Sequence, residues 1–180
     1  MLNSNAFFNN DLALILLVTL FISRIKLLVS NNIFKTFLIN FLGVTLHELS
    51  HLFVGLLLGA KPYWISLIPH KNNTGYTMGY VEFSRLNNIN SFPTAMAPLL
   101  LLLPAYYLKT FFFQYFDWHF IPSQILYIII MAIIVDNAIP SWQDFKVGFY
   151  FFIPATIWIV LIILSFLLIK ILYIHFTYSY

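Results

Sequence analysis

The chain has 180 residues, of which 61% are hydrophobic and 8% are charged. Apolar runs of about 18 or more residues recur along it, which is typical of helices that span a membrane. The formal net charge of +3 is scattered and forms no basic face interleaved with aromatic residues, so we expect no nucleic-acid partner. There is no cysteine, which excludes disulfides and thiolate ligands, so any metal would be held by His, Asp or Glu.

The apolar runs predict an all-α polytopic membrane protein of about five transmembrane helices, with a short β-hairpin between the second and the third. No stretch is left for a separate soluble domain, so residues 1–180 are expected to form a single transmembrane domain. We expect a multi-pass integral protein of the plasma (cytoplasmic) membrane, in contact with the lipid bilayer. The helices are expected at about 11–29, 33–60, 92–116, 121–139 and 147–174.

Local features refine these helices. The first run lacks the positive start and the cleavage site of a secretory signal, so we expect it to be retained. Late in that run, Arg24 and Lys26 are expected to snorkel to the interface. Residues 62–84 contain two aromatic and β-branched runs around KNNTG, which predicts the hairpin. Pro98 and Pro104 lie inside the third run, which is therefore expected to be kinked or to begin irregularly.

The second run contains the sequence HELSH, from His47 to His51. Residues four apart share one face of a helix, so the two imidazoles lie together, with Glu48 one position around. This is the spacing of zinc sites in which two neutral His hold the metal and the carboxylate acts on the water bound to it. Zinc lowers the pKa of that water to about 7, so Glu48 could take its proton and pass it to a leaving amine.

The membrane setting favours a functional interpretation of HELSH. The pattern is short, and a lone His in a helix is more often a hydrogen-bonded core residue. Here, however, three ionisable side chains lie close together in an apolar run, and each costs roughly 2.5–3.5 kcal/mol near the bilayer centre. Such a cluster is hard to maintain without a metal or a polar cavity, so we interpret it as a metal site.

Two His leave a catalytic zinc site one protein ligand short. Asp136 and Asp144 both lie in the break DNAIPSWQDFK, where Pro140 interrupts the helix and leaves polar groups that require a protein-lined cavity. Either carboxylate could be the third ligand, and an ordinary loop position is the alternative for each. Interfacial placement explains the other histidines, His70, His119 and His175.

Together these residues resemble the site-2 protease family of intramembrane zinc metalloproteases. HELSH in a membrane helix, followed by Gly55, is similar to the first motif of that family. DNAIPSWQD resembles the second motif, in which an Asn and a Pro precede an Asp that ligates zinc. By that resemblance Asn137 and Pro140 match the Asn and the Pro, and Asp144 matches the ligand. The similarity covers roughly residues 36–150.

The second motif departs from the commonest family pattern. Asp144 lies in the sequence QDF rather than between a Leu and a Gly, and one residue fewer separates it from Pro140. Asp136 therefore stays open as the alternative ligand.

The resemblance implies a zinc metalloendopeptidase that hydrolyses peptide bonds of membrane-protein or peptide substrates. It implies Zn²⁺ held by His47, His51 and Asp144. It also implies Glu48 as the general base, with Asn137 as a hydrogen-bonding partner of the substrate or the developing oxyanion.

Other interpretations stay open beside this one. Buried His and acids also mark ion pathways, so the chain could be a metal-binding or ion-transport protein, or an inactive protease-like scaffold. Gly55 and Gly59 form GLLLG, which could let another backbone approach closely or reflect plain helix packing. An exposed edge of the hairpin could take up a substrate strand, or the hairpin could be an inert amphipathic connection.

Overall fold

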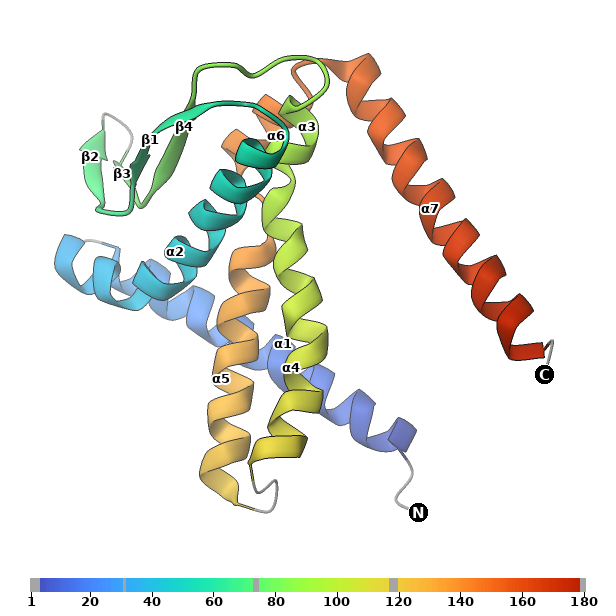
Figure 1. The fold of residues 1–180 in the computed structure, drawn as a ribbon. Coiled ribbons are helices and arrows are strands. Elements are labelled where there is room, and N and C mark those ends of the chain that lie inside the picture. The colour runs from blue at the N-terminus through green and yellow to red at the C-terminus, as the bar shows by residue number, and fades with distance from the viewer. Residues whose placement is uncertain (1–3, 31, 73–74, 117–119, 179–180) are drawn as a thin grey trace.

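The computed structural model describes residues 4–30, 32–72, 75–116 and 120–178, and this part of the chain is mostly helical (Figure 1). The helices are α1 (Ser4–Val29), α2 (Ile33–Leu57), α3 (Ser91–Ala95), the 3₁₀ helix η1 (Ala97–Leu101), α4 (Leu102–Tyr115), α5 (Ile121–Ala138), α6 (Trp142–Gly148) and α7 (Phe152–Tyr178). The strands are β1 (Pro62–Ser66), β2 (His70–Asn72), β3 (Gly75–Thr77) and β4 (Tyr80–Phe83).

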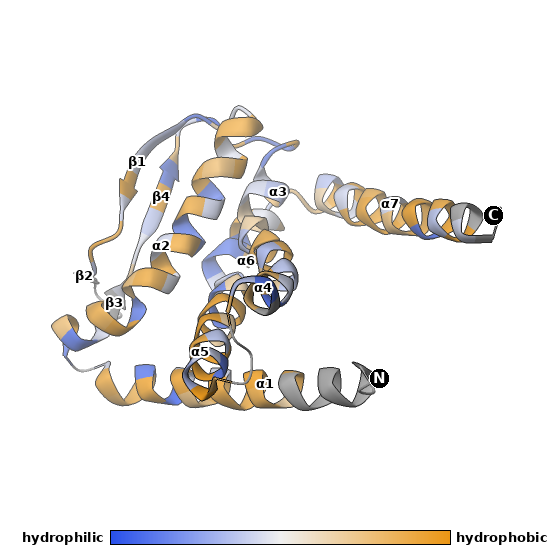
Figure 2. Cartoon of the chain, turned by 60° about the horizontal axis from the view of Figure 1, so that its bottom comes forward, coloured by the Kyte–Doolittle hydropathy of each residue, from blue (hydrophilic) through white to orange (hydrophobic). Residues whose placement is uncertain are grey.

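Four helices in the described residues are long and apolar enough to cross a membrane, which makes the protein a multi-pass membrane protein. Large apolar side chains are exposed along these helices, and Figure 2 shows hydrophobic residues running along their length. A lipid-facing surface has this character, because hydrocarbon is its solvent. The four stretches are Leu12–Val29, Ile33–Leu57, Ile121–Ala138 and Phe152–Ile174.

The expected single helix over residues 92–116 is corrected, because this segment is divided into α3, η1 and α4. Pro98 has no N–H and cannot donate to the carbonyl of Thr94, so α3 does not continue through it. Pro104 instead lies in the first turn of α4, where a helix needs no donor. The irregular beginning that the prolines predict is confirmed.

The last helix begins later than expected. Residues around position 147 belong to α6, a short helix that ends at Gly148, and α7 begins only at Phe152. The interruption predicted at Pro140 is confirmed, since α5 ends at Ala138 and α6 begins at Trp142.

The predicted hairpin is confirmed between α2 and α3. β1 pairs antiparallel with β4 at its base, and β2 pairs antiparallel with β3 at its tip. Asn73 and Thr74 of the expected turn lie outside the described residues. The base packs on α2, because a Cβ added at Gly55 would lie 2.2 Å from the ring of Phe83 in β4.

Helix α2 ends in a Schellman motif. Gly59 has a φ of 69°, the N–H of Ala60 donates to the carbonyl of Gly55 at 2.8 Å, and the N–H of Gly59 donates to that of Leu56 at 3.2 Å. A Cβ added at Gly59 would meet no described atom within 4 Å. The GLLLG sequence therefore combines a contact with strand β4 at Gly55 and a helix end at Gly59.

Helices α1, α4 and α5 share a buried apolar cluster of Ile15, Phe112 and Tyr127. In Figure 1, α4 and α5 run side by side and α1 crosses them. The short helices α3 and α6 lie together beside the C-terminal end of α2, from which the chain continues into the hairpin. Helix α7 diverges from this bundle in both ribbon views. Near its start, Trp158 Nε1 donates to the carbonyl of Ile89 at 2.8 Å.

Candidate metal centre

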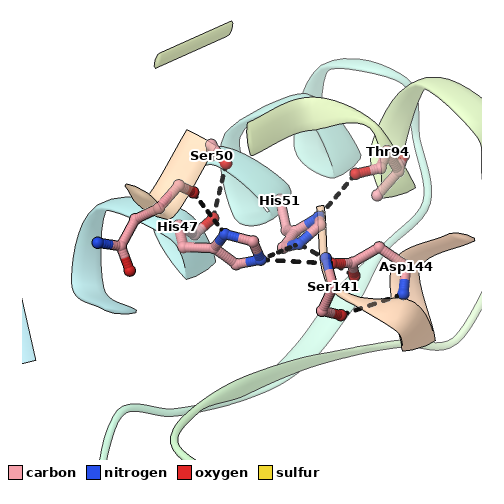
Figure 3. A network of polar contacts seen from close by, with 7 residues as sticks. His47, Ser50, His51, Thr94, Ser141 and Asp144 are labelled. Carbon is pink, nitrogen blue, oxygen red and sulfur yellow. Dashed lines mark hydrogen bonds and ion pairs between the residues drawn. The ribbon is translucent and has the colours of Figure 1, made fainter. Parts of the chain in front are cut away.

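Both histidines of HELSH face the same point from one side of α2. His47 and His51 lie four residues apart in this helix, and their Nε2 atoms are 3.2 Å apart. Their rings meet edge to face, with centroids 4.9 Å apart. Figure 3 shows both rings directed toward Asp144. The helical spacing thus brings the two imidazoles together as predicted from the sequence.

Asp144 reaches this point from α6. Its Oδ2 lies 3.3 Å from His47 Nε2, and its Oδ1 lies 3.2 Å from His51 Nε2. One ligand atom from each of the three residues lies within 4.8 Å of the others, so the group could hold a metal ion. Asp136 is not part of this group in the described residues.

The opposite ring nitrogens show which tautomer each histidine adopts. His47 Nδ1 lies 2.8 Å from the carbonyl oxygen of Asn137, and His51 Nδ1 lies 2.7 Å from that of Thr94. A carbonyl oxygen only accepts hydrogen bonds, so each Nδ1 carries the proton and donates it. In a neutral imidazole the Nε2 atom is then an acceptor with a free lone pair. Both lone pairs are directed at the Asp144 carboxylate.

These carbonyls are free because helices end beside them. The carbonyl of Thr94 lies four residues before Pro98, which has no N–H to give to it. The carbonyl of Asn137 lies in the last turn of α5, and Pro140 prevents the next turn from forming. At each helix end, one of the main-chain acceptors therefore receives a hydrogen bond from a ring of the HELSH segment.

The donor set fits a zinc ion. The two imidazole nitrogens lie 3.2 Å apart, and each lies 3.2–3.3 Å from one oxygen of the Asp144 carboxylate, so these acceptor atoms repel unless a cation or a proton lies among them. Ligands at about 2.0–2.1 Å from a tetrahedral zinc lie about 3.3–3.4 Å from one another. A histidine that ligates a metal commonly donates its other N–H to a carbonyl, as both rings do here.

Asp144 supplies a negative charge to this group. Burial by itself raises the pKa of Asp144, but hydrogen bonds from the rings of His47 and His51, when protonated, and from Ser141 outweigh it and hold the pKa well below its usual range. The carboxylate is therefore ionised at neutral pH. A zinc ion would take the place of the Nε2 protons, which would leave two neutral imidazoles and one anionic carboxylate as ligands, a donor set that Zn²⁺ prefers.

Glu48 lies next to the ligands without joining them. It is 8% exposed and lines the same cavity as His47 and His51. No hydrogen bond of its carboxylate is found within the described ranges. The position is compatible with the role predicted for it, in which the carboxylate faces a water molecule near the metal ligands.

Asn137 contributes its main chain as well as its side chain. Its carbonyl orients His47, and its amide Nδ2 donates to the carbonyl of Ile133 at 2.8 Å. The amide also lies directly over Gly43 of α2, where an added Cβ would come within 2.1 Å of Nδ2. Contact with the substrate, the role that the resemblance implies, stays a prediction.

Asp136, the alternative ligand, is engaged by α1. Lys26 Nζ forms an ion pair with Oδ2 of Asp136 at 2.5 Å, and Ser23 Oγ donates to its Oδ1 at 2.6 Å. Lys26 is 19% exposed in this pair, and its extension to the membrane interface stays a prediction. An opposite charge within reach holds its ammonium against α5.

A cavity of about 750 Å³ opens beside the ligands. Residues of α1, α2, α5 and α6 line it, and the hairpin closes another side through residues 77–81 and Phe83. Gly79 is close to this wall, since an added Cβ would lie 2.7 Å from Val44 and 3.0 Å from Glu48. The volume is within the usual range for a ligand pocket.

The sequence analysis overlooked three contributors, namely Thr94, Ser141 and Lys26. A proline four residues after Thr94 is a visible sign of a free carbonyl, and Ser141 stands three residues before Asp144 in the pattern of a capping box. Nothing in the sequence indicates that Lys26 pairs with Asp136, because α1 and α5 are far apart along the chain. His119, one of the interfacial histidines, lies outside the described residues, as do the side chains of His70 and His175.

No protein-family model, curated protein or solved structure matches this chain. The fold and the site together define the class of protein: a multi-pass membrane protein with a His-His-Asp group that could hold a metal ion.

Proposed function

We propose that the protein is an intramembrane zinc metalloendopeptidase of the plasma membrane, similar to the site-2 proteases, that hydrolyses peptide bonds of membrane-protein or peptide substrates. The observation that carries this proposal is the convergence of His47, His51 and Asp144 within 3.2–3.3 Å beside a cavity that Glu48 also lines. Two neutral imidazoles, one carboxylate ligand and one further carboxylate are the groups that zinc hydrolases use.

In this proposal each side chain has a distinct role. His47, His51 and Asp144 would hold Zn²⁺, which when bound supplies the Lewis acidity that acidifies water and polarises a carbonyl group. Glu48 accepts the proton of the attacking water as its oxygen bonds to the carbonyl carbon. The same carboxylic acid returns that proton to the amine as the C–N bond breaks.

Asn137 is proposed to contact the substrate. Its amide nitrogen has two hydrogens and gives one to the carbonyl of Ile133. The other hydrogen is the proposed donor to the substrate or to the negative charge that develops on its carbonyl oxygen.

The hairpin is proposed to receive the substrate strand. Among the described strands β4 is paired on one edge only, and Val81 and Phe83 of this strand line the cavity. An extended segment added along β4 would lie beside the ligands, with its peptide groups held by main-chain hydrogen bonds. Such binding would also unwind a helical substrate.

A fifth membrane crossing is proposed for η1 and α4 together. Five residues of 3₁₀ helix at about 2.0 Å each and fourteen of α-helix at about 1.5 Å give a length of about 31 Å. This is close to the roughly 30 Å thickness of the hydrocarbon layer.

The proposed function is tested by Glu48→Gln, with Glu82→Gln as its matched control. Glu82 is the only other glutamate and bonds Tyr63 on the hairpin. Glu48→Gln should keep bound zinc and lower cleavage by about 10²–10⁴-fold, because the ligands stay and the base is lost. Zinc content by elemental analysis and cleavage of casein in detergent measure the two effects, and membrane proteomes with each variant identify natural substrates.

The outcomes separate the alternatives. Glu82→Gln should behave like the wild type in both assays, and His47→Ala should lose the zinc. A Glu48→Gln variant that cleaves at the wild-type rate would remove the assignment. Zinc binding without cleavage of any substrate by the wild type would identify a metal-binding or transport protein, or an inactive scaffold.

A further inference from the structure

We propose that Ser141 is a positioning residue of the candidate metal centre, and the proposal rests on the metal ligands of the function proposed above. Ser141 is the N-cap of α6, and Asp144 is the third residue of that helix. In capping α6, the main-chain N–H of Ser141 holds the Asp144 carboxylate in the orientation that faces both histidines, and Ser141 Oγ fixes the main chain from which this carboxylate extends.

The cap and the ligand share the same atoms. The N–H of Asp144 donates to Ser141 Oγ at 3.2 Å, and the N–H of Ser141 donates to Asp144 Oδ2 at 2.6 Å, which together form a capping box. That same Oδ2 lies 3.3 Å from His47 Nε2. The other oxygen, Oδ1, is then left facing His51 at 3.2 Å. Closing the cap therefore directs each carboxylate oxygen at one imidazole.

The path of the chain explains why a cap is needed. After α5 ends at Ala138, only a few residues separate Pro140 from Asp144, and the carboxylate must turn back toward α2. In a capping box the side chain at the third helical position turns back over the helix N-terminus, which provides this direction. Without the bond from the Ser141 N–H, the Asp144 side chain would be distributed among its staggered rotamers, most of which direct the carboxylate away from the histidines.

Packing holds α6 where the cap can act. A Cβ added at Gly148 would lie 3.1 Å from Met96 and 3.3 Å from Ala95, so α6 lies close against the segment that contains Thr94. The carbonyl of Thr94 orients His51. One helix contact thus keeps the capped carboxylate near the histidine that it faces.

A simpler role for Ser141 is stabilisation of α6 alone, and the chain offers a matched control for it. Asn32 caps α2 and accepts a hydrogen bond from the N–H of Lys35 at 3.1 Å. This cap lies at the opposite end of α2 from His51. Loss of either cap should lower the stability of the protein, but only the loss of the Ser141 cap should reach the metal ligands.

The experiment compares Ser141→Ala, Ser141→Thr and Asn32→Ala in the full chain purified in detergent. Competition with a chromophoric chelator measures the affinity for Zn²⁺, the visible absorption of bound Co²⁺ reports the ligand geometry, and thermal unfolding reports stability. Ser141→Ala removes the Oγ acceptor and keeps the main-chain N–H that bonds Asp144 Oδ2, so it should weaken Zn²⁺ binding by about 10-fold and change the Co²⁺ spectrum. Ser141→Thr keeps the capping oxygen and should restore both.

Asn32→Ala should lower the unfolding temperature and leave Zn²⁺ affinity and the Co²⁺ spectrum unchanged. Wild-type affinity in Ser141→Ala, or an equal loss of affinity in Asn32→Ala, would overturn the positioning role of Ser141 and leave the proposed protease untouched. If Ser141→Ala weakens zinc binding as expected but the wild-type protein cleaves no substrate, this inference is upheld and the proposed function is overturned. A wild-type chain that binds neither metal overturns both.

Discussion

Each imidazole of the candidate metal centre is oriented by a carbonyl from a different part of the chain. His47 donates to Asn137 at the end of α5, and His51 donates to Thr94 at the end of α3. These bonds set the tautomers, so the nitrogens that face Asp144 are the ones with free lone pairs. At the scale of residues, the site depends on main-chain atoms as much as on the ligands.

Gly43→Ala tests the contact between α2 and Asn137. The new Cβ would lie 2.1 Å from Asn137 Nδ2 and 2.4 Å from its Cγ, so Asn137 must shift. Its carbonyl then no longer holds His47, and we expect zinc affinity to fall by about 10-fold, the lower end of outer-shell effects. Chelator competition measures this change.

Asn137→Ala added to Gly43→Ala should restore zinc affinity, because it removes the clash and keeps the carbonyl. Gly59→Ala is the control glycine in the same segment. It should cost about 1 kcal/mol of stability from its positive φ without changing zinc affinity. Wild-type zinc binding in Gly43→Ala would contradict the role of this contact.

Lys26→Met tests the ion pair that engages Asp136. It leaves a carboxylate that is 14% exposed without its cation. Loss of one partner from a buried pair costs about 3–5 kcal/mol, and less here because both side chains are partly exposed. Thermal unfolding in detergent measures the loss. Adding Asp136→Asn should recover most of it, and a double variant as unstable as the single one would refute the coupling.

At the scale of elements, helix ends supply the site. α3 ends at Ala95, three residues before Pro98, and α5 ends at Ala138, two residues before Pro140, which is followed by the cap of α6. Each end leaves main-chain groups that a continuous helix would consume. A rigid helix, α2, then carries both histidines to those groups. This arrangement explains why two prolines lie beside a site to which they contribute no ligand.

Pro98→Ala tests the role of the first of these ends. An N–H at position 98 would compete with His51 for the carbonyl of Thr94, so zinc affinity should fall several-fold, within the range of outer-shell effects. Pro104→Ala is the control, because Pro104 is exposed in the first turn of α4. Chelator competition compares the two variants, and equal zinc affinity in both would show that the free carbonyl is dispensable.

At the scale of the whole molecule, the polar groups gather on one side of an apolar bundle. The apolar cluster of α1, α4 and α5 holds the helices together, whereas the cavity lies between α2, α5, α6 and the hairpin. α7 adds an apolar helix that is exposed along most of its length, apart from its first turns. The site thus rests on segments from positions 26 to 144, and its integrity should depend on the overall fold.

Metal removal tests this dependence. A ligand at a hundredfold excess over its Kd stabilises the folded state by about 2.7 kcal/mol, which corresponds to about 5–10 °C in Tm for a chain of this size. Zinc should raise the Tm of the wild type by this amount, and a chelator should reverse the effect. The Tm of His47→Ala should not change when zinc is added, whereas the Tm of Glu82→Gln should rise as much as that of the wild type. An equal response in both variants would place zinc elsewhere.

The sequence by itself determined the apolar helices, the hairpin, the break at Pro140 and the pairing of His47 with His51. These features are local, because helical periodicity, turn residues and a missing N–H act within a few positions along the chain. The same locality explains the errors at residues 92–116 and at the start of α7, where a proline and a cap shifted the boundaries of runs that are apolar throughout.

Only the tertiary structure decided which aspartate faces the histidines. Asp136 and Asp144 lie in the same polar break and look equivalent along the chain. Lys26 of α1 pairs with the first, and the cap of α6 turns the second toward α2. Both outcomes depend on contacts between segments that are distant in sequence, and the charge pairs and hydrogen bonds of a buried group are set by those contacts rather than by its neighbours in the chain.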